Sequence, residues 1–116
     1  MKYMLLIYGD ESAAAHATPE QTRAVADEYE AFSRSIRESG NFLDGDPFLP
    51  TTTATTVAAN GSGIGSSGGP AVSARPQLIA YYKVEADGPE QAVEMATRVP
   101  HAKYGAVEVR QIVQYD

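Results

Sequence analysis

The sequence predicts an α+β domain whose elements follow the order β-α-β-β-α-β around an antiparallel sheet. Apolar residues recur at helical spacing in two segments, 18–40 and 87–100, and runs typical of strands lie before, between and after them. The length of 116 residues suits one domain with a single hydrophobic core. We therefore expect a single domain over residues 1–116.

The first element is a strand over residues 2–9, because KYMLLIYG is apolar at both odd and even positions. Residues 77–86, QLIAYYKVEA, show the same property and predict a second strand that is covered on both faces. Tyr81 and Lys83 should share one face of that strand, and Tyr82 should lie on the other.

The first long helix has a clear beginning and a clear end. Thr18 is a suitable N-cap, Pro19 fits the first helical position, and Gln21 completes a capping box. Gly40 is a typical residue for the end of such a helix. Between these points one apolar stripe follows the helical spacing: Val25, Tyr29, Phe32 and Ile36.

The middle of the chain predicts a connector, a strand and a loop in that order. Residues 41–50, NFLDGDPFLP, are rich in turn formers, and residues 51–59, TTTATTVAA, have the composition of a pleated strand. A glycine-rich loop is expected at 60–76. After it comes the strand at 77–86, then a short helix that begins near Asp87.

The last element is a strand over residues 106–115. Val107 and Val109 alternate with Glu108 and Arg110, which puts one apolar face against one charged face. The complete order corresponds to the ferredoxin-like split β-α-β arrangement, which has helices on one face of its sheet. Since two strands are apolar on both faces, we expect the uncovered face to pack on a second copy, giving a homodimer.

Composition excludes several classes of protein. The formal net charge is −6 and no basic cluster occurs, so we expect no nucleic-acid partner. There is no cysteine, which excludes disulfides and thiolate metal sites, and no spacing links the two histidines to a metal site. The apolar run at the start is too short to cross a membrane, so we expect a soluble, cytoplasmic protein without membrane contact.

The glycine-rich segment does not have the pattern of a phosphate-binding loop. A strand rather than a helix is expected after it, and no lysine lies close after its last glycine. A linker between domains is equally unsuitable, because each half would be too small for its own core. Two interpretations stay open: a flexible excursion that reaches over the open sheet face or the partner subunit, and a tip without a role.

Several segments together resemble the YCII-related proteins of the DGPF type. They are the opening MKYMLLIYGDE, the ESG at the end of the first helix, ATTV at 54–57, GGP at 68–70, YYKVEADGPEQAVEMATRVP at 81–100 and GAVEVRQI at 105–112. The resemblance covers essentially the whole chain. The name-giving motif is degenerate, because only Gly69 and Pro70 match it, with Gly68 in place of aspartate and Ala71 in place of phenylalanine.

The resemblance implies a dimeric α+β barrel of a small bacterial family, with a cleft between sheet and loops. It also implies small organic molecules as ligands and chemistry without a cofactor. In the wider family a histidine on the first helix pairs with an aspartate as the suspected acid–base dyad. By register from Gly40 that histidine corresponds to a position near Tyr29, and neither member of the dyad is present. Relatives are often encoded beside extracytoplasmic-function sigma factors, which implies a possible link to such a factor.

Four residues are our candidates for catalysis: Tyr29, Asp46, Arg75 and Tyr81. Asp46 lies in the connector, which should open near Tyr29, and could act as a base, although aspartates beside a glycine often serve the turn itself. Arg75, at the mouth of the strand 77–86, could bind a carboxylate or enolate oxygen. Tyr81 or Tyr82 should reach the open face of the sheet.

Three further residues are candidates for substrate binding: Glu108, Arg110 and His101. Glu108 and Arg110 should point into the barrel of a dimer, where they would contact substrate or form an ion pair across the interface. His101 follows Pro100 in a turn, where it would be solvated or face a ligand.

Two functions stay open at this point. One is a cofactor-independent enzyme with acid–base chemistry of the isomerase, lyase, dehydratase or cyclase type. The other is a non-catalytic ligand-binding or regulatory module with a possible sigma-factor link.

Overall fold

A computed structural model describes residues 1–115 and confirms the α+β class. The main sheet is antiparallel, with strand order β2-β5-β1-β6, which is the ferredoxin-like order. The elements, in chain order, are β1 (Lys2–Gly9), α1 (Glu11–His16), α2 (Pro19–Glu38), β2 (Phe42–Pro47), the 3-10 turn η1 (Thr51–Thr53), β3 (Thr55–Asn60), β4 (Gly63–Gly68), β5 (Gln77–Glu85), α3 (Pro89–Arg98), the 3-10 turn η2 (Pro100–Ala102) and β6 (Ala106–Gln111).

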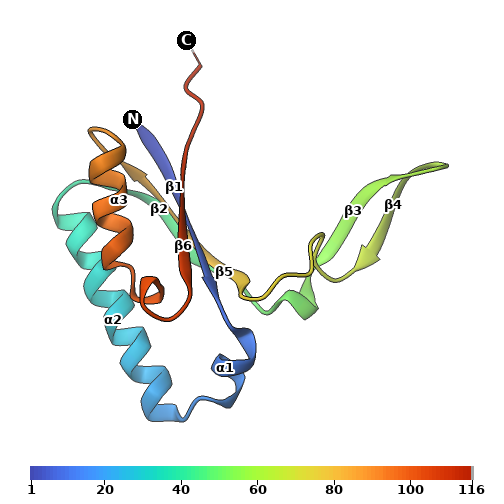
Figure 1. Ribbon diagram of the computed structural model, residues 1–116, viewed down its shortest axis with the longest axis horizontal. Helices are drawn as coiled ribbons and strands as arrows, with labels where there is room; N and C mark the ends of the chain where they lie inside the picture. Colours follow the sequence, from blue (N-terminus) through green and yellow to red (C-terminus); the bar gives the residue numbers. More distant parts are fainter. Residues whose placement is uncertain (116) are drawn as a thin grey trace.

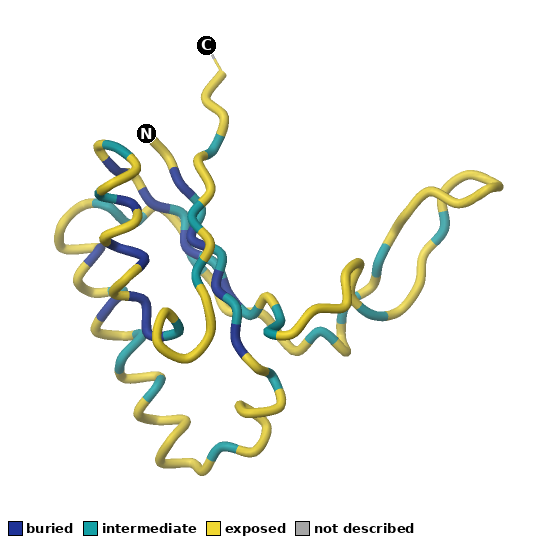
Figure 2. Tube along the Cα trace, in the orientation of Figure 1, coloured by how far each residue is buried: buried dark blue, intermediate teal, exposed yellow. Residues whose placement is uncertain are grey.

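Helices α2 and α3 cover one face of the main sheet (Figure 1). The core lies between these two layers, where the tube in Figure 2 is coloured as buried. Alternate residues of β1 point into it, and Leu5 and Ile7 are fully buried. The helices contribute Phe32 and Ile36 from α2 and Met95 from α3.

The other face of the sheet is open. Met4 lies between Lys83 and Arg110, and Leu6 lies between Tyr81 and Glu108 on the neighbouring strands. The alternation predicted for β5 is therefore confirmed, because Tyr82 is buried under α2 while Tyr81 is on the open face. We call this surface the open face.

Helix α2 begins and ends where the sequence predicts. The Thr18 hydroxyl accepts a hydrogen bond from the Gln21 N–H at 3.1 Å, and the Gln21 side chain accepts one from the Thr18 N–H at 2.9 Å. Gly40, just past the helix, has φ +79°, a conformation that favours glycine. Among residues 1–115, no helix has both the length and the apolar character needed to cross a membrane.

The second strand of the main sheet is β2, which the sequence predicted to be part of a connector. That prediction was wrong because β2 is short and lies at an edge, where Asp, Gly and Pro are tolerated. Asp44 and Asp46 face solvent, and Pro47 stands at the end of the strand, where it removes little pairing. Gly45 allows close packing, since a Cβ there would lie 2.7 Å from Cδ1 of Tyr82.

The threonine-rich strand and the glycine-rich loop were also placed incorrectly. Residues 55–60 form β3, but β3 pairs with β4 in a separate two-stranded sheet and not with the main sheet. The predicted loop at 60–76 therefore contains a strand at 63–68, because backbone pairing with β3 needs no side chains from its glycines and serines. We call residues 55–68 the arm, which projects from the body in Figure 1.

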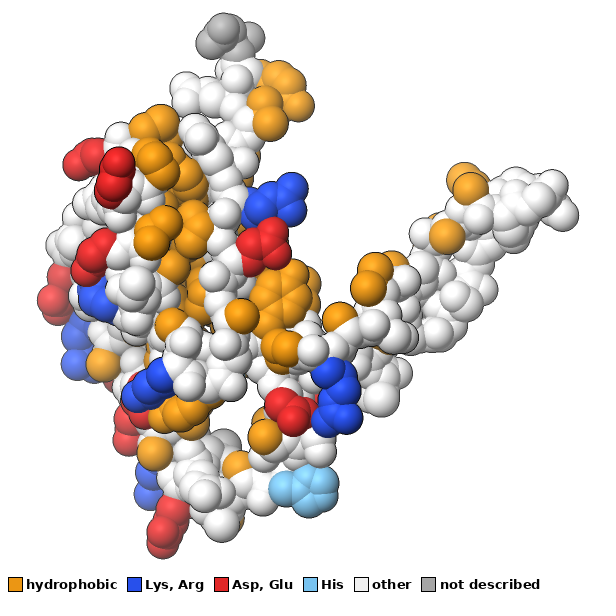
Figure 3. All heavy atoms as spheres, viewed as in Figure 1, with side chains coloured by type: hydrophobic (Ala, Val, Ile, Leu, Met, Phe, Trp, Pro, Cys, Tyr) orange, Lys and Arg blue, Asp and Glu red, His pale blue; other side chains and the backbone are white. Residues whose placement is uncertain are grey.

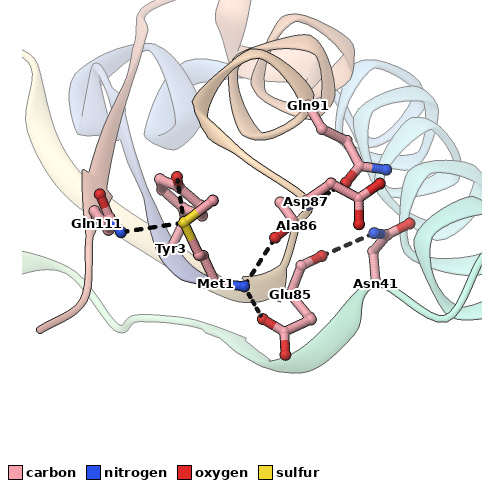
Figure 4. Close-up of polar contacts among 8 residues, drawn as sticks. All are labelled: Met1, Tyr3, Asn41, Glu85, Ala86, Asp87, Gln91 and Gln111. Atoms are coloured by element: carbon pink, nitrogen blue, oxygen red, sulfur yellow. Dashed lines mark hydrogen bonds and ion pairs between the residues drawn. The ribbon is translucent and has the colours of Figure 1, made fainter. Parts of the chain in front are cut away.

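Polar contacts connect the beginning of β1 to the end of β5 (Figure 4). The Met1 ammonium donates to the Ala86 carbonyl at 2.9 Å and pairs with the Glu85 carboxylate at 2.8 Å. The hydrogen bond from this ammonium lowers the pKa of Glu85. Asn41 donates to the Glu85 carbonyl at 2.8 Å, so β2, β5 and the chain start are joined at one end of the sheet.

Candidate functional site

A cavity of about 480 Å³ lies between α2 and the sheet near the β2 edge. Val25, Ala26, Tyr29 and Ser33 line it from the helix, and Ile79, Ala80 and Tyr82 line it from β5. These walls are mostly apolar and carry a few hydroxyl groups, as is common in small-molecule sites. Tyr29, Ser33 and Tyr82 are therefore among the polar groups that a ligand inside the cavity would meet, and Arg37 and Asp46 also line it.

Tyr29 is hydrogen-bonded to His101, with 2.5 Å between its hydroxyl and Nδ1 of the imidazole. Tyr29 comes from α2, and His101 comes from the turn η2, 72 residues later in the chain. Tyr104 packs edge-on against the imidazole with ring centroids 5.8 Å apart. Gly9 makes room for the ring, because a Cβ at that position would lie 2.8 Å from His101 Cδ2.

Partial burial affects the two members of this pair in opposite directions. It raises the pKa of the Tyr29 hydroxyl well above its usual value, and Tyr82 and Glu28 add to the increase. Burial lowers the pKa of His101, although the nearby Glu28 carboxylate opposes that shift. Both side chains are therefore neutral at neutral pH, and one proton is shared along the hydrogen bond between them.

The lowered pKa of His101 leads to a testable prediction about how the free energy of unfolding depends on pH. Below the usual value of 6.5, the unfolded chain binds a proton at this residue more readily than the folded protein does. The free energy of unfolding should therefore be constant above about pH 6.5 and fall as the pH decreases through the folded pKa. Urea titrations at several pH values measure this.

Two variants serve as comparisons for that measurement. His101→Gln should remove the decrease that begins below about pH 6.5, while His16→Gln, at the other histidine, should keep it. Asp10 and Glu85 also have lowered pKa values, but their usual values of 3.8 and 4.5 put their effect at more acidic pH. A His101→Gln protein that keeps the full decrease would contradict the prediction.

Tyr82 and Ser33 form a second hydroxyl pair on the cavity wall. Their oxygens are 2.6 Å apart, and either hydroxyl can be the donor. Tyr82 is 8% exposed and packs edge-on against Phe32 with ring centroids 5.1 Å apart. The cavity thus has a second polar group that can donate a hydrogen bond to a ligand oxygen.

The four residues predicted to be catalytic do not form one cluster. Asp46 and Tyr81 are brought together, since the Tyr81 hydroxyl donates to Asp44 at 3.0 Å and to Asp46 at 3.4 Å. By strand register these two hydrogen bonds lie on the open face, on the other side of the sheet from Tyr29. Asp46 and Tyr81 nevertheless also border the cavity at the β2 edge. The hydrogen bond to Asp44 raises the pKa of Tyr81.

Arg75 is part of a different region. Its guanidinium is 3.3 Å from the Asp10 carboxylate, and both side chains are largely exposed. It lines a groove of about 770 Å³ at the base of the arm, together with Tyr8 and Leu78. The pKa of Asp10 is lowered first by the Ser12 N–H and also by Arg75.

Glu108 and Arg110 lie on the open face, opposite the valines of β6, as the alternation predicts. They form an ion pair at 3.2 Å, and both side chains are well exposed. His101, the third candidate for substrate binding, is on the helix side of the sheet next to Tyr29. The seven candidates therefore divide among the cavity, the open face and the arm base.

Sequence reasoning missed the contact between Tyr29 and His101 and the contact between Asp44 and Tyr81. No local pattern connects residues 29 and 101. The contact of Asp44 with Tyr81 could have been predicted from the sequence. Asp44 and Asp46 lie two residues apart, so they share a face once 42–47 is assigned as a strand.

Within residues 1–115, no group of three or more His, Asp or Glu side chains is arranged to hold a metal ion. Comparison with protein families gives a match to the YCII-related domain, and it spans residues 1–116. No curated protein matches the chain significantly.

Proposed function

The chain belongs to the YCII-related domain family, and on this premise we propose that it is a cofactor-independent enzyme that transfers a proton on a small organic molecule. The hydrogen bond between Tyr29 and His101 beside the α2 cavity carries this proposal. Tyr29 lines the cavity and His101 does not, so in this proposal the tyrosine stands between a ligand and the imidazole.

In the proposed reaction, Tyr29 and His101 act together as the base. The Tyr29 oxygen takes a proton from the substrate while the hydroxyl proton passes to Nδ1 of His101. Because burial raises the pKa of Tyr29, a free tyrosinate is unfavourable, and transfer to a neutral imidazole avoids it. Return of the proton to another substrate atom completes an isomerisation. In an elimination the electrons of the broken C–H bond form the new double bond, and the proton goes to the group that leaves from the neighbouring carbon.

The Tyr82 and Ser33 hydroxyls would stabilise the negative charge that develops on the substrate. A substrate oxygen that gains negative charge as its proton leaves would accept a hydrogen bond from one of them. Most of the cavity lining is apolar, and a hydrogen bond is stronger in such surroundings than in bulk water. A volume of about 480 Å³ suits a molecule with an apolar part and a carbonyl or hydroxyl group.

The alternative is a non-catalytic ligand-binding or regulatory module. One observation favours it: Tyr29 and His101 satisfy each other's hydrogen bonds, as members of a structural pair would. In that case the same cavity would hold a ligand without changing it.

Solvent deuterium exchange separates the two functions before the natural reaction is known. The protein would be incubated in D₂O with a panel of 2-oxo acids, enolisable ketones and unsaturated lactones, with binding and C–H exchange both followed by NMR. Enzyme-dependent deuterium uptake at a carbon next to a carbonyl group is expected for at least one compound that binds. Binding without exchange across the panel would support the module instead.

A further inference from the structure

Among the described residues, Arg37 is the one cation that lines the α2 cavity. It lies about one helical turn beyond Ser33 and two turns beyond Tyr29, because the three positions are four residues apart and share one stripe of α2. The cavity thus has an acid–base group, a hydroxyl pair and a guanidinium in a row along the helix. Such a row would recognise a molecule that carries an anionic group at one end.

Arg37 differs from most of the other arginines in its partners. Four of them form ion pairs with carboxylates of the chain, namely Arg34, Arg75, Arg98 and Arg110. Figure 3 shows basic side chains beside acidic ones along the helical side of the molecule. Within residues 1–115, Arg37 forms no ion pair and its guanidinium donates no hydrogen bond to the chain. Its N–H groups are therefore available to a ligand.

The ring of Phe42 fixes the position of this guanidinium. Cζ of Arg37 lies 4.4 Å from the ring centroid of Phe42, which is a cation–π distance. Phe42 is itself fixed, because it pairs with Val84 in the sheet and packs edge-on against Tyr82 with ring centroids 6.3 Å apart. A cation–π contact needs no acceptor for the N–H groups, so they can still form the two parallel hydrogen bonds of an arginine–carboxylate pair.

Asp46 is the charge on the cavity lining that would oppose an anion. It lies at the other end of β2 from Phe42, four residues later in the strand. An extended strand of that length spans up to about 13 Å, which exceeds the Debye length of about 8 Å at physiological salt. Asp46 also accepts a hydrogen bond from the Tyr81 hydroxyl at 3.4 Å. Its carboxylate therefore does not neutralise the guanidinium of Arg37.

We propose that Arg37 binds a carboxylate group of the molecule that occupies the cavity, so that this molecule is an oxo acid and not a neutral ketone or lactone. The inference rests on the function proposed above in that the oxo acid is then the substrate of Tyr29 and His101. The chain carries a net charge of −6, which disfavours anions in general, so an anionic ligand needs a local cation of this kind. Arg37 is an exposed residue, so the carboxylate would keep part of its water.

The order of groups along α2 defines the class of oxo acid further. With the carboxylate at Arg37, the carbonyl oxygen would lie at the Ser33–Tyr82 pair and a carbon-bound proton near Tyr29. Four helical residues rise about 6 Å, which corresponds to roughly two or three carbon atoms between carboxylate and carbonyl. The cavity lining beyond Tyr29 is apolar and suits an alkyl chain, since it includes Val25, Ala26 and Ile79.

Calorimetric titration with 4-oxooctanoate and its methyl ester tests the proposal, because the two probes differ in charge and share the carbonyl and the alkyl chain. The wild-type protein should bind the acid at least about 10-fold more tightly than the ester. Arg37→Met should weaken binding of the acid about 10- to 100-fold and leave the ester unchanged. Arg37→Lys should be intermediate, because lysine keeps the charge without the planar fork. The matched control Arg23→Met removes the same charge from α2 outside the cavity and should change neither affinity.

Circular dichroism establishes that the variants are folded. Equal affinity of the wild-type protein for acid and ester, binding of neither at millimolar concentration, or an Arg37→Met protein that keeps its affinity for the acid would each overturn the proposal.

The proposed enzymatic function is tested separately by deuterium exchange on the same probes. Tyr29→Phe should lose exchange and keep the preference for the acid, because it leaves the guanidinium in place. A preference for the acid that depends on Arg37, without exchange in the wild-type protein, would support the carboxylate site and contradict the enzymatic function. Equal binding and equal exchange of acid and ester would support the enzymatic function and overturn the carboxylate site.

Discussion

Replacing Tyr29 by phenylalanine is expected to lower turnover about 100- to 10,000-fold, the usual contribution of a positioned acid–base group. The substitution keeps the ring in the cavity wall and removes only the oxygen that would take the substrate proton. Stability should fall by about 1 kcal/mol, the typical value of one hydrogen bond. The measurement is the rate of deuterium exchange or turnover for a compound from the panel, together with a urea titration.

Tyr3→Phe is the matched control for this prediction. Tyr3 is a buried tyrosine of β1 whose hydroxyl contacts the sulfur of Met1 and does not line the cavity. Its loss should leave turnover unchanged. His101→Gln should lower turnover about as much as Tyr29→Phe does, because the two residues act as one base in the proposed mechanism.

The same assay decides between Tyr29 and Tyr81 as the acid–base group. Asp46 and Tyr81 remain candidates from the sequence, and their hydrogen bond makes Tyr81→Phe a direct test. If Tyr81→Phe abolishes turnover while Tyr29→Phe does not, the mechanism proposed for Tyr29 and His101 is wrong.

The parts of the fold that the sequence predicted correctly are those with local causes. The Thr18 capping box, the apolar stripe of α2 and the glycine at its end act over a few residues, and the helix has the expected limits. The strands at β1 and β5 follow from runs that are apolar on both faces. Each of these signals can be seen in a short window of the chain.

The errors concern segments whose structure depends on a distant partner. The DGDP of β2 has the composition of a turn, and it is a strand because Asp44 and Asp46 pair with Lys83 and Tyr81 at the sheet edge. The glycines of β4 are extended because β3 pairs with them. Local propensity was too weak to predict either, since the pairing comes from tertiary structure.

The same distinction between local causes and distant partners applies to the candidate site. Register correctly put Glu108 and Arg110 opposite the valines, and it correctly separated Tyr81 from Tyr82. It could not bring His101 to Tyr29, because that contact depends on how the turn η2 packs against β1 and α2. Two glycines, Gly9 and Gly105, make this packing possible.

Gly105→Ala is expected to destabilise the protein by about 3 kcal/mol, the upper end of the usual cost of overpacking. A Cβ at Gly105 would overlap the Tyr8 carbonyl oxygen and lie 3.3 Å from the Gly9 Cα. These are backbone atoms of β1, so no side chain can rotate away. Relief requires β6 to separate from β1 where Ala106 pairs with Tyr8.

Substitutions at two other glycines serve as references for the effect of Gly105→Ala. Gly61→Ala adds the same methyl group where nothing lies within 4 Å, so its effect on stability should be within about 0.5 kcal/mol. Gly9→Ala should be intermediate, because its closest contacts are the side chains of Ile79 and His101, which can move. Urea titrations of the three variants measure the order, and equal stability of Gly105→Ala and Gly61→Ala would contradict it.

The Gly105 variant also connects the fold to the proposed chemistry. The Gly105 N–H donates to the His101 carbonyl at 2.8 Å, so a shift of this turn moves the imidazole with it. Where Gly105→Ala still folds, His101 should move away from Tyr29 and gain access to water, and its pKa should return toward 6.5. The decrease in stability that begins below about pH 6.5 should then become smaller, as in His101→Gln. Unchanged pH dependence in a folded Gly105→Ala protein would show that the turn does not position His101.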